Sequence, residues 1–446
     1  MIETIQRESL WHVIPLSNFA RAYDKYSRVY SKSQIPESTY PDRFFLLRES
    51  ELSAGIAKAN SLLERLGLPG NRLLAMRTSV APDELHDNMR NGVGRFVQRG
   101  NIHVEGVAWV EVAADRFSLA PASVEEASAQ SLALSRDLKL YGELRPRSLS
   151  ILPIARGCQA ACPFCFSEAS ASAEQEQANL SEDLMREYAI AAKGRGAERF
   201  VITGGGEPGL VRPDQLRRMI GIGRETLGKT VLITNGHHLA KLDDAGLIER
   251  LDDYSRAGLS VLAISRHHHD DETRSRLMTL STDVARIASA WRVRDRSTRL
   301  RLRFTCVLQR GGIEDLASLE AYVGWAAALG VPEICFKELY VSTSVESVYH
   351  RFAANEWSHA HQVPLSLVLV FADRHRFEEV ARLPWGAPVY RGAWRGAAIQ
   401  IAAYTEPSLF WERRHGIARS WNLMSDGRCL VSLEDRASEL KLASVR

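Results

Sequence analysis

Short apolar stretches alternate with amphipathic stretches between residues 148 and 340 of the chain. The apolar stretches have the length of buried strands, and the amphipathic ones repeat apolar residues at helical spacing. The expected strands are residues 149–154, 199–203, 230–234, 259–265, 300–308 and 333–339, and the expected helices are 181–193, 213–227, 243–256, 271–291 and 313–329. Repeated strand–helix units predict a parallel sheet with right-handed crossovers, either closed as a barrel or open.

The chain on either side of this region follows other patterns. Residues 1–145 predict an α+β module that either recognises a substrate or covers the sheet, and residues 341–446 predict an α+β extension that covers the barrel. In the first region we expect helices at 53–66, 82–97 and 123–141 and a hairpin at 102–112 and 116–119. In the second we expect a strand at 364–371, a helix at 373–383, a strand at 397–404 and a hairpin at 420–432.

Three cysteines follow the first expected strand of the central region, at Cys158, Cys162 and Cys165. Thiolates select zinc, copper(I) or iron–sulfur clusters, and three of them leave one corner of a four-iron cluster open to a chelating cofactor. The aromatic Phe164 can shield such a cluster and lie beside a bound nucleoside. The other interpretation is a structural zinc site completed by a distant ligand, for which His237, His238 and His267 to His269 are candidates.

The Cys-x3-Cys-x2-Cys spacing, with an aromatic residue before the last cysteine, resembles the motif of the radical S-adenosylmethionine (radical SAM) superfamily. The segment Thr203-Gly204-Gly205-Gly206-Glu207-Pro208 is similar to the Gly-Gly-Glu-Pro motif with which that family holds the methionine amino group of SAM. The resemblance covers about residues 148 to 340. It implies a partial (β/α)6 barrel, one [4Fe–4S] cluster on the three cysteines, and S-adenosyl-L-methionine on the fourth iron.

The same resemblance implies SAM contacts for individual side chains and loops. They are Phe164, Gly205, Gly206, Glu207, Asn235 and Ser265. Asn235 and Ser265 can equally be plain turn formers. The family often has an arginine about fourteen residues after that serine, but Thr279 stands there in this chain, so we assign no residue to that role.

The resemblance also implies a reaction. A flavodoxin or ferredoxin-type donor reduces the cluster, SAM is cleaved to methionine and a 5′-deoxyadenosyl radical, and the radical takes a hydrogen atom from a peptide or small-molecule biosynthetic substrate. No cysteine pair recurs at cluster spacing after Cys165, unlike in many peptide-modifying relatives. The alternative function is that of a zinc-stabilised, non-enzymatic binding protein.

Three further features sit on or after the later strands. Alternation predicts that Cys335 points into the barrel and that Cys306 packs outward. There the S–H of Cys335 can donate a hydrogen atom to a substrate radical, although a buried cysteine that only packs is the more common case. By the same rule Arg301, Arg303 and Gln309 face inward and can bind a carboxylate or phosphate, although a solvated basic face is the more common outcome. In His267 to Glu272 we expect an acidic helix start and one histidine in contact with substrate or SAM. The alternatives are a histidine that acts as acid or base and a second metal site, which no ligand pair at helical spacing supports.

Composition limits the classes of partner and the cellular compartments that we expect for this protein. The 446 residues carry 57 basic and 54 acidic side chains, so the net charge of +3 gives no global argument for a nucleic-acid or membrane partner. The first residues mix charges where a signal peptide is apolar, and the apolar run at 363–372 is too short to span a bilayer. Six cysteines, three of them in one loop, fit a reducing compartment. We therefore expect a soluble, cytoplasmic protein.

Overall fold

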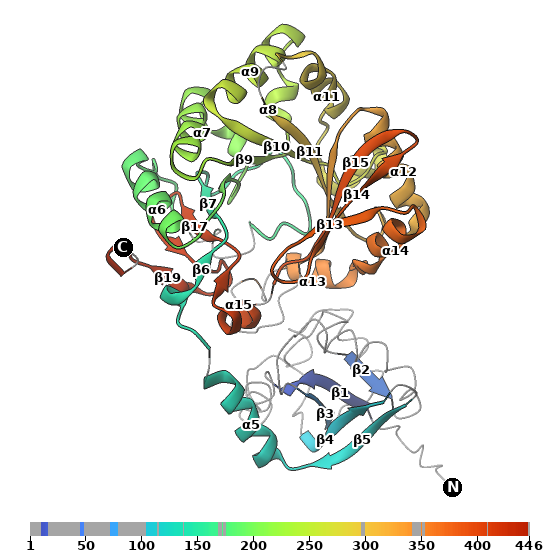
Figure 1. The fold of residues 1–446 in the computed structure, drawn as a ribbon. Helices are drawn as coiled ribbons and strands as arrows, with labels where there is room; N and C mark the ends of the chain where they lie inside the picture. Colours follow the sequence, from blue (N-terminus) through green and yellow to red (C-terminus); the bar gives the residue numbers. More distant parts are fainter. Residues whose placement is uncertain are drawn as a thin grey trace. The chain divides into compact units, whose positions relative to one another are not determined.

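The computed structural model forms two compact units. The first contains Met1–Leu138 and Val341–His350, and the second contains Lys139–Tyr340 and Arg351–Arg446 (Figure 1). The structure describes residues 10–16, 45–48, 72–78, 104–113, 116–136, 138–167, 172, 175–295, 299–340, 349, 353–407 and 409–444.

The described part of the first unit is an antiparallel sheet with strand order β2-β1-β3-β4-β5. Its strands are β1 (Leu10–Pro15), β2 (Phe45–Arg48), β3 (Leu73–Thr78), β4 (Val104–Val112) and β5 (Phe117–Ala122), and helix α5 (Val124–Arg136) follows. The predicted hairpin is confirmed, because β4 and β5 pair antiparallel. The sequence analysis missed β1 to β3, and the helices expected at 53–66 and 82–97 lie outside the described residues.

The second unit contains the parallel sheet that the sequence predicts. Six strands lie side by side in chain order, each parallel to the next. They are β7 (Leu149–Leu152), β8 (Phe200–Ile202), β9 (Thr230–Thr234), β10 (Leu259–Ser265), β11 (Arg301–Leu308) and β12 (Glu333–Glu338). All six strand predictions are therefore confirmed to within a few residues at their ends.

Helices cover the outer side of these strands (Figure 1). They are α6 (Glu182–Gly194), α7 (Pro213–Leu227), α9 (Asp244–Ala257), α10 (Asp271–Met278), α11 (Val284–Val293) and α12 (Leu316–Ala328). Ser181, Asp243, Asp270 and Asp315 begin four of them by accepting a backbone N–H with the side chain. The single helix expected at 271–291 is wrong in one respect, because Thr279 adopts a left-handed conformation (φ 52°) that ends α10.

The C-terminal region adds strands to both edges of the same sheet. β15 (Ala397–Tyr404) pairs parallel with β12, and β17 (Trp421–Met424) pairs parallel with β7. Beyond them lie β13 (Glu378–Arg382) and β14 (Pro388–Trp394) at one edge and β18 (Cys429–Leu430) and β19 (Glu439–Leu440) at the other. The order is β13-β14-β15-β12-β11-β10-β9-β8-β7-β17-β18-β19, and over the described residues this α/β sheet is open.

Two predictions for this region are wrong. Residues expected to form a strand at 364–371 fold as α14 (Ser366–Arg374), and the helix expected at 373–383 is replaced by strand β13. The apolar run Ser366-Leu367-Val368-Leu369-Val370-Phe371 suits a strand by composition. In the fold, Val368 and Phe371 are buried while Leu369 and Val370 are 41% and 54% exposed, which is the pattern of a helix that covers a core.

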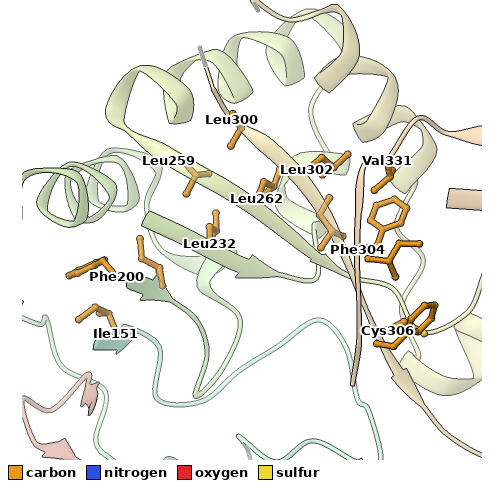
Figure 2. Packing of buried hydrophobic residues seen from close by; sticks show 14 of the residues in the cluster. Ile151, Phe200, Leu232, Leu259, Leu262, Leu300, Leu302, Phe304, Cys306 and Val331 are labelled. Carbon is orange, nitrogen blue, oxygen red and sulfur yellow. The ribbon is translucent and has the colours of Figure 1, made fainter. Parts of the chain in front are cut away.

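One large core lies between the six parallel strands and their helices. Figure 2 shows its strand side, where Phe200, Leu232, Leu262, Leu302 and Phe304 pack together. We call the opposite side of the strands, away from these helices, the inner face. It carries a second and smaller apolar cluster of Val231, Val261 and Ala263, with Val201 and Ile233 packed against it. Among the described residues, no helix is both long and apolar enough to span a membrane.

Candidate functional site

The cysteine loop follows the carboxyl end of β7. Cys158 is exposed, and Cys162 and Cys165 are half-buried. The backbone N–H of Cys165 donates to the carbonyl of Cys162 at 3.1 Å, which closes a tight turn between the last two thiols. Cys162 also packs against Ala160, Met278 and Leu280. The loop thus places three thiols close together in partly apolar surroundings. Thiolates are the ligands that iron–sulfur clusters prefer.

Thr279 supports this loop from α10. The N–H of Ala161 donates to the Thr279 hydroxyl oxygen at 2.9 Å and to the carbonyl of Met278 at 3.0 Å. A β-branched residue at positive φ is strained, so this conformation persists only because surrounding contacts impose it. The sequence analysis assigned nothing to Thr279, and no local pattern could have revealed a contact across 118 residues.

The glycine-rich segment after β8 lies directly against the cysteine loop. A Cβ atom on Gly205 would be 2.6 Å from the carbonyl oxygen of Ile154, and one on Gly206 would be 2.2 Å from that of Gly157. The N–H groups of Gly206 and Glu207 donate to the same two carbonyls, at 2.8 and 2.9 Å. These glycines are therefore required for close approach of one loop to the other.

Glu207 joins the glycine segment to the end of β9. It is only 4% exposed, and its carboxylate accepts from the N–H of Gly209 (2.7 Å), the hydroxyl of Thr234 and the N–H of Asn235 (2.8 Å). Burial raises the pKa of Glu207, while these three donors act in the lowering direction. Oε1 accepts two of the bonds and Oε2 accepts one, so Oε2 can take a further donor.

Asn235 extends the connection to the first thiol. Its Nδ2 donates to Gln159 Oε1 at 3.1 Å and lies 3.5 Å from Cys158 Sγ, and its Oδ1 accepts from the N–H of His237 at 2.9 Å. The carboxyl ends of β7, β8 and β9 are thus linked through one hydrogen-bonded network around the cysteine loop. Ser265 lies at the carboxyl end of β10, in register with Thr305 of β11.

Phe164 packs among aromatic side chains from two later segments. Its ring meets that of His267 edge to face, with centroids 5.0 Å apart, and lies 5.6 Å from that of Trp357 on α13 (Ala353–Ala360). Trp357 in turn stacks on His361 at 3.8 Å. The sequence analysis identified Phe164 from its place beside Cys165 but missed Trp357, which is distant in the chain.

His267 is the member of the histidine triplet nearest the cysteine loop. It is 5% exposed, and its Nδ1 accepts from the N–H of Val307 at 3.1 Å, so the neutral ring carries its proton on Nε2. Burial lowers the pKa of His267 to about 3. Among the described residues, no acceptor forms a hydrogen bond with His267 Nε2.

The rest of the His267–Glu272 segment has a structural role. Asp270 caps α10 by accepting from the N–H of Thr273 at 2.7 Å, which confirms the predicted helix start. Arg266 is 2% exposed and donates to the carbonyls of His268 (2.7 Å) and His269 (2.8 Å). The sequence analysis missed Arg266 because an arginine next to three histidines gives no sign that it is buried.

The two cysteines on the later strands point as alternation predicts. Cys306 is fully buried in the large core (Figure 2), whereas Cys335 lies on the inner face, where Arg303 and Lys337 are among its nearest charges. Burial raises the pKa of the Cys335 thiol. Arg301 and Arg303 also face inward, and both pair with Glu333. Gln309 is fully buried. A Cβ atom added at Gly312 would lie 3.0 Å from Gln309 Cγ, so the Gln309 side chain packs closely against this glycine.

The donor set fits an iron–sulfur cluster by its chemistry, since three thiols share one loop and Asn235 approaches the first of them. Within the ranges that the structure describes, no three His, Cys, Asp or Glu side chains converge closely enough to hold a single metal ion.

Comparison with known proteins gives a family match and several distant structural likenesses. Residues 152–297 match the model of the radical SAM superfamily. Streptococcus suis SuiB bound to S-adenosylmethionine is 16% identical, with a TM-score of 0.42, and the match covers 69% of this chain and 64% of SuiB. SuiB bound to the precursor peptide SuiA is 14% identical, with a TM-score of 0.45 and coverage of 81% and 80%.

A radical SAM methyltransferase from Sphaerobacter thermophilus is 17% identical, with a TM-score of 0.36 and coverage of 68% and 70%. None of the curated protein sequences matches the chain. The identification therefore rests on the family model together with the cysteine and glycine motifs that it spans. Residues 152–297 thus match the radical SAM superfamily, whose enzymes use a [4Fe–4S] cluster and S-adenosylmethionine.

Proposed function

We propose that Cys158, Cys162 and Cys165 hold one [4Fe–4S] cluster whose fourth iron binds SAM. When bound, this pair supplies reductive SAM cleavage and a 5′-deoxyadenosyl group that accepts a hydrogen atom from a peptide or small-molecule biosynthetic substrate. The electron donor is a flavodoxin or ferredoxin-type protein, and the setting is the reducing cytoplasm. The observation that carries the proposal is the cysteine loop at the carboxyl end of β7, braced by the glycine segment and by Asn235.

SAM contacts are assigned to Phe164, Gly205, Gly206, Glu207, Asn235 and Ser265. Among the residues that the structure describes, Glu207 Oε2 accepts only the Asn235 N–H, so it can also accept from the SAM ammonium. The Asn235 amide is next to the first thiol, and Phe164 is next to the third. Gly206, Glu207 and Asn235 thus belong to the hydrogen-bonded network around the cysteine loop, and Gly205 and Phe164 lie beside it. Ser265 ends the neighbouring strand.

His267 is the histidine that we assign to substrate or SAM. Its neutral Nε2–H is a donor of fixed orientation, because Val307 holds Nδ1 and Phe164 contacts the ring. It keeps one protonation state over the physiological range, since its pKa is lowered to about 3. An oxygen or ring nitrogen of the bound molecule is the acceptor that such a group prefers.

Cys335 is assigned as a hydrogen-atom donor to the substrate radical. A raised pKa keeps the thiol protonated near neutral pH, and only the S–H form can give up a hydrogen atom. Cys335→Ala should still form 5′-deoxyadenosine but should divert the product and lose deuterium uptake from solvent. Cys306→Ala is the matched control. Normal product with unchanged deuterium content in Cys335→Ala would leave Cys335 as a packing residue.

We also propose an architecture for the parallel sheet and a role for each of the two flanking regions. The six parallel strands β7 to β12, with helices on one side, support a partial (β/α)6 barrel. Residues 1–145 are assigned to substrate recognition, and 341–446 to covering and extending the barrel. Deletion of residues 1–140 should leave slow, substrate-independent SAM cleavage while abolishing turnover of the true substrate.

The direct test is an assay for 5′-deoxyadenosine with anaerobically reconstituted protein and a chemical reductant. The proposal predicts slow formation of 5′-deoxyadenosine that requires SAM and reductant and is absent from protein without iron. A protein that holds one zinc ion, has no visible chromophore and cleaves no SAM would instead be a binding protein.

A further inference from the structure

Four cations gather on the inner face at the amino ends of the parallel strands. They are Arg199, Lys229, Arg301 and Arg303, which we call the amino-end cations. Their neighbours in sequence point the other way: Phe200, Leu302 and Phe304 belong to the large core, and the hydroxyl of Thr230 donates to the carbonyl of Ile220 in α7. Because side chains alternate along a strand, the four cations share the inner face.

Strand register places these cations close together. Phe200 pairs with Thr230, and the N–H of Phe200 donates to the carbonyl of Lys229 at 2.9 Å, so Arg199 and Lys229 are direct neighbours on adjacent strands. Val231 and Arg301 both pair with Val261 of β10. Only β10 therefore separates the two pairs of cations, and it presents small side chains there.

Charge is unbalanced within this group. Glu333 is 5% exposed, and its Oε1 lies 2.6 Å from Arg301 while its Oε2 lies 2.7 Å from Arg303. Both oxygens of this carboxylate are thus used by two of the four cations. Glu198, which precedes Arg199, pairs with Arg147 at 2.9 Å.

Arg199 and Lys229 are half-buried, and their side chains have no hydrogen bond or ion pair to any residue that the structure describes. Burial lowers the pKa of both groups, and the neighbouring cations lower each pKa further, whereas Glu198 acts in the raising direction on Arg199 and Glu333 on Lys229. Half-buried like charges without partners oppose folding, so the fold itself gives no reason for them.

We propose that the amino-end cations form a binding site for a multiply charged oxyanion, phosphate or carboxylate. Two guanidinium groups are held in place by Glu333, and the unpaired Arg199 and Lys229 can close on the anion from neighbouring strands. The site lies at the amino ends of the strands, whereas the cysteine loop follows a carboxyl end. The two sites therefore lie at opposite ends of the strands, and Arg301 is separated from the carboxyl end of β11 by the length of that strand, roughly 23 Å.

The test measures binding of inorganic pyrophosphate to the full, anaerobically reconstituted chain, by calorimetry and by thermal unfolding, with sodium chloride at equal ionic strength as reference. The proposal predicts a rise in Tm beyond that caused by the salt. The double variant Arg199→Met, Lys229→Met should bind at least about tenfold more weakly, because it removes two charge-assisted contacts.

Arg217→Met is the matched control, because Arg217 is an exposed cation already paired with Asp253 at 2.9 Å. It should bind pyrophosphate like the unaltered protein. Lys229→Gln alone provides a second variant that keeps Arg199. No stabilisation beyond the salt reference, or equal binding by the double variant, would overturn the proposal.

Two sources of oxyanion can then be separated. A tetraglutamate peptide that displaces pyrophosphate indicates acidic side chains of a peptide, whereas displacement by inorganic phosphate alone indicates a phosphorylated small molecule. Since binding is measured without SAM, failure here leaves the proposed radical SAM activity untouched.

Discussion

The two ends of strands β8 and β9 differ in how their polar side chains are paired. At the carboxyl ends, the buried carboxylate of Glu207 has three donors, and the amide of Asn235 is bonded on both its atoms. At the amino ends, Arg199 and Lys229 have no side-chain partner among the described residues.

The difference teaches what each end does. Buried polar groups that make several hydrogen bonds add rigidity, so Glu207 and Asn235 form a frame that positions the three thiols. Unpaired, half-buried cations lower the free energy of unfolding, so we expect the amino ends of these strands to be stabilised when an anion binds there.

The largest effect should come from the thiols. Replacing Cys158, Cys162 and Cys165 together by Ala should abolish iron binding, from about four irons per chain to none, because no thiolate remains in the frame. Iron and sulfide analysis after anaerobic reconstitution measures this. Cys429→Ala, at a fully buried cysteine of β18, should retain the cluster. A full cluster in the triple variant would show that Cys306, Cys335 and Cys429 bind iron.

Glu207→Ala should weaken SAM binding while the cluster stays. Loss of a carboxylate–ammonium contact costs about 1.5–3 kcal/mol, or roughly 10- to 150-fold in Kd. Titration calorimetry with SAM on the reconstituted protein gives this number. Glu207→Gln keeps an acceptor oxygen and should lose less. If both variants are less stable but bind SAM normally, Glu207 only joins β8 to β9.

A pH effect should come from Glu412, on helix α15 (Leu409–His415). Burial raises the pKa of this carboxyl from 4.5 to about 7, although the nearby Arg419 acts in the lowering direction. The unfolded chain therefore releases this proton at lower pH than the folded protein. The free energy of unfolding should fall by about 1–3 kcal/mol as pH rises from 4.5 to 7.

Glu412→Gln should remove this fall, as urea unfolding at several pH values can measure. Glu434→Gln, a half-buried acid elsewhere in the unit, is the control. An unchanged slope in Glu412→Gln would mean that another group titrates.

The smallest effect concerns Lys229, whose pKa is lowered mainly by burial. A lysine with a lowered pKa in the folded state makes the protein more stable as pH rises toward its usual value of 10.5. Lys229→Met should remove that gain and slightly raise stability at neutral pH, because it relieves repulsion with Arg199. Thermal unfolding at pH 7 and pH 10 measures both. Lower stability at pH 7 would show that Lys229 has an unseen partner.

The sequence predicts the central sheet and the positions of the thiols well, because both are local patterns. Strands β7 to β12 are apolar runs, and Cys158 to Cys165 is one short loop. The supports of that loop are not local: Thr279 and Trp357 reach it from distant segments. The helix at 366–374 was also unpredictable, since its β-branched composition favours a strand until packing decides.

The amino-end cations show again that a sequence pattern does not reveal contacts between distant segments. Alternation along β11 correctly predicts that Arg301 and Arg303 face inward, yet it cannot reveal that Glu333 binds both. Nor can any pattern within β8 or β9 show that Arg199 and Lys229 stand next to each other, because the strand order decides it.

The central claim is that the three-cysteine loop carries one [4Fe–4S] cluster whose fourth iron is open to SAM. Electron paramagnetic resonance of the reduced, reconstituted protein tests it most directly. The account predicts the spectrum of a single reduced cubane that changes when SAM is added, with about four irons and four sulfides per chain. A spectrum that SAM leaves unchanged, or a colourless protein that holds zinc, would contradict it.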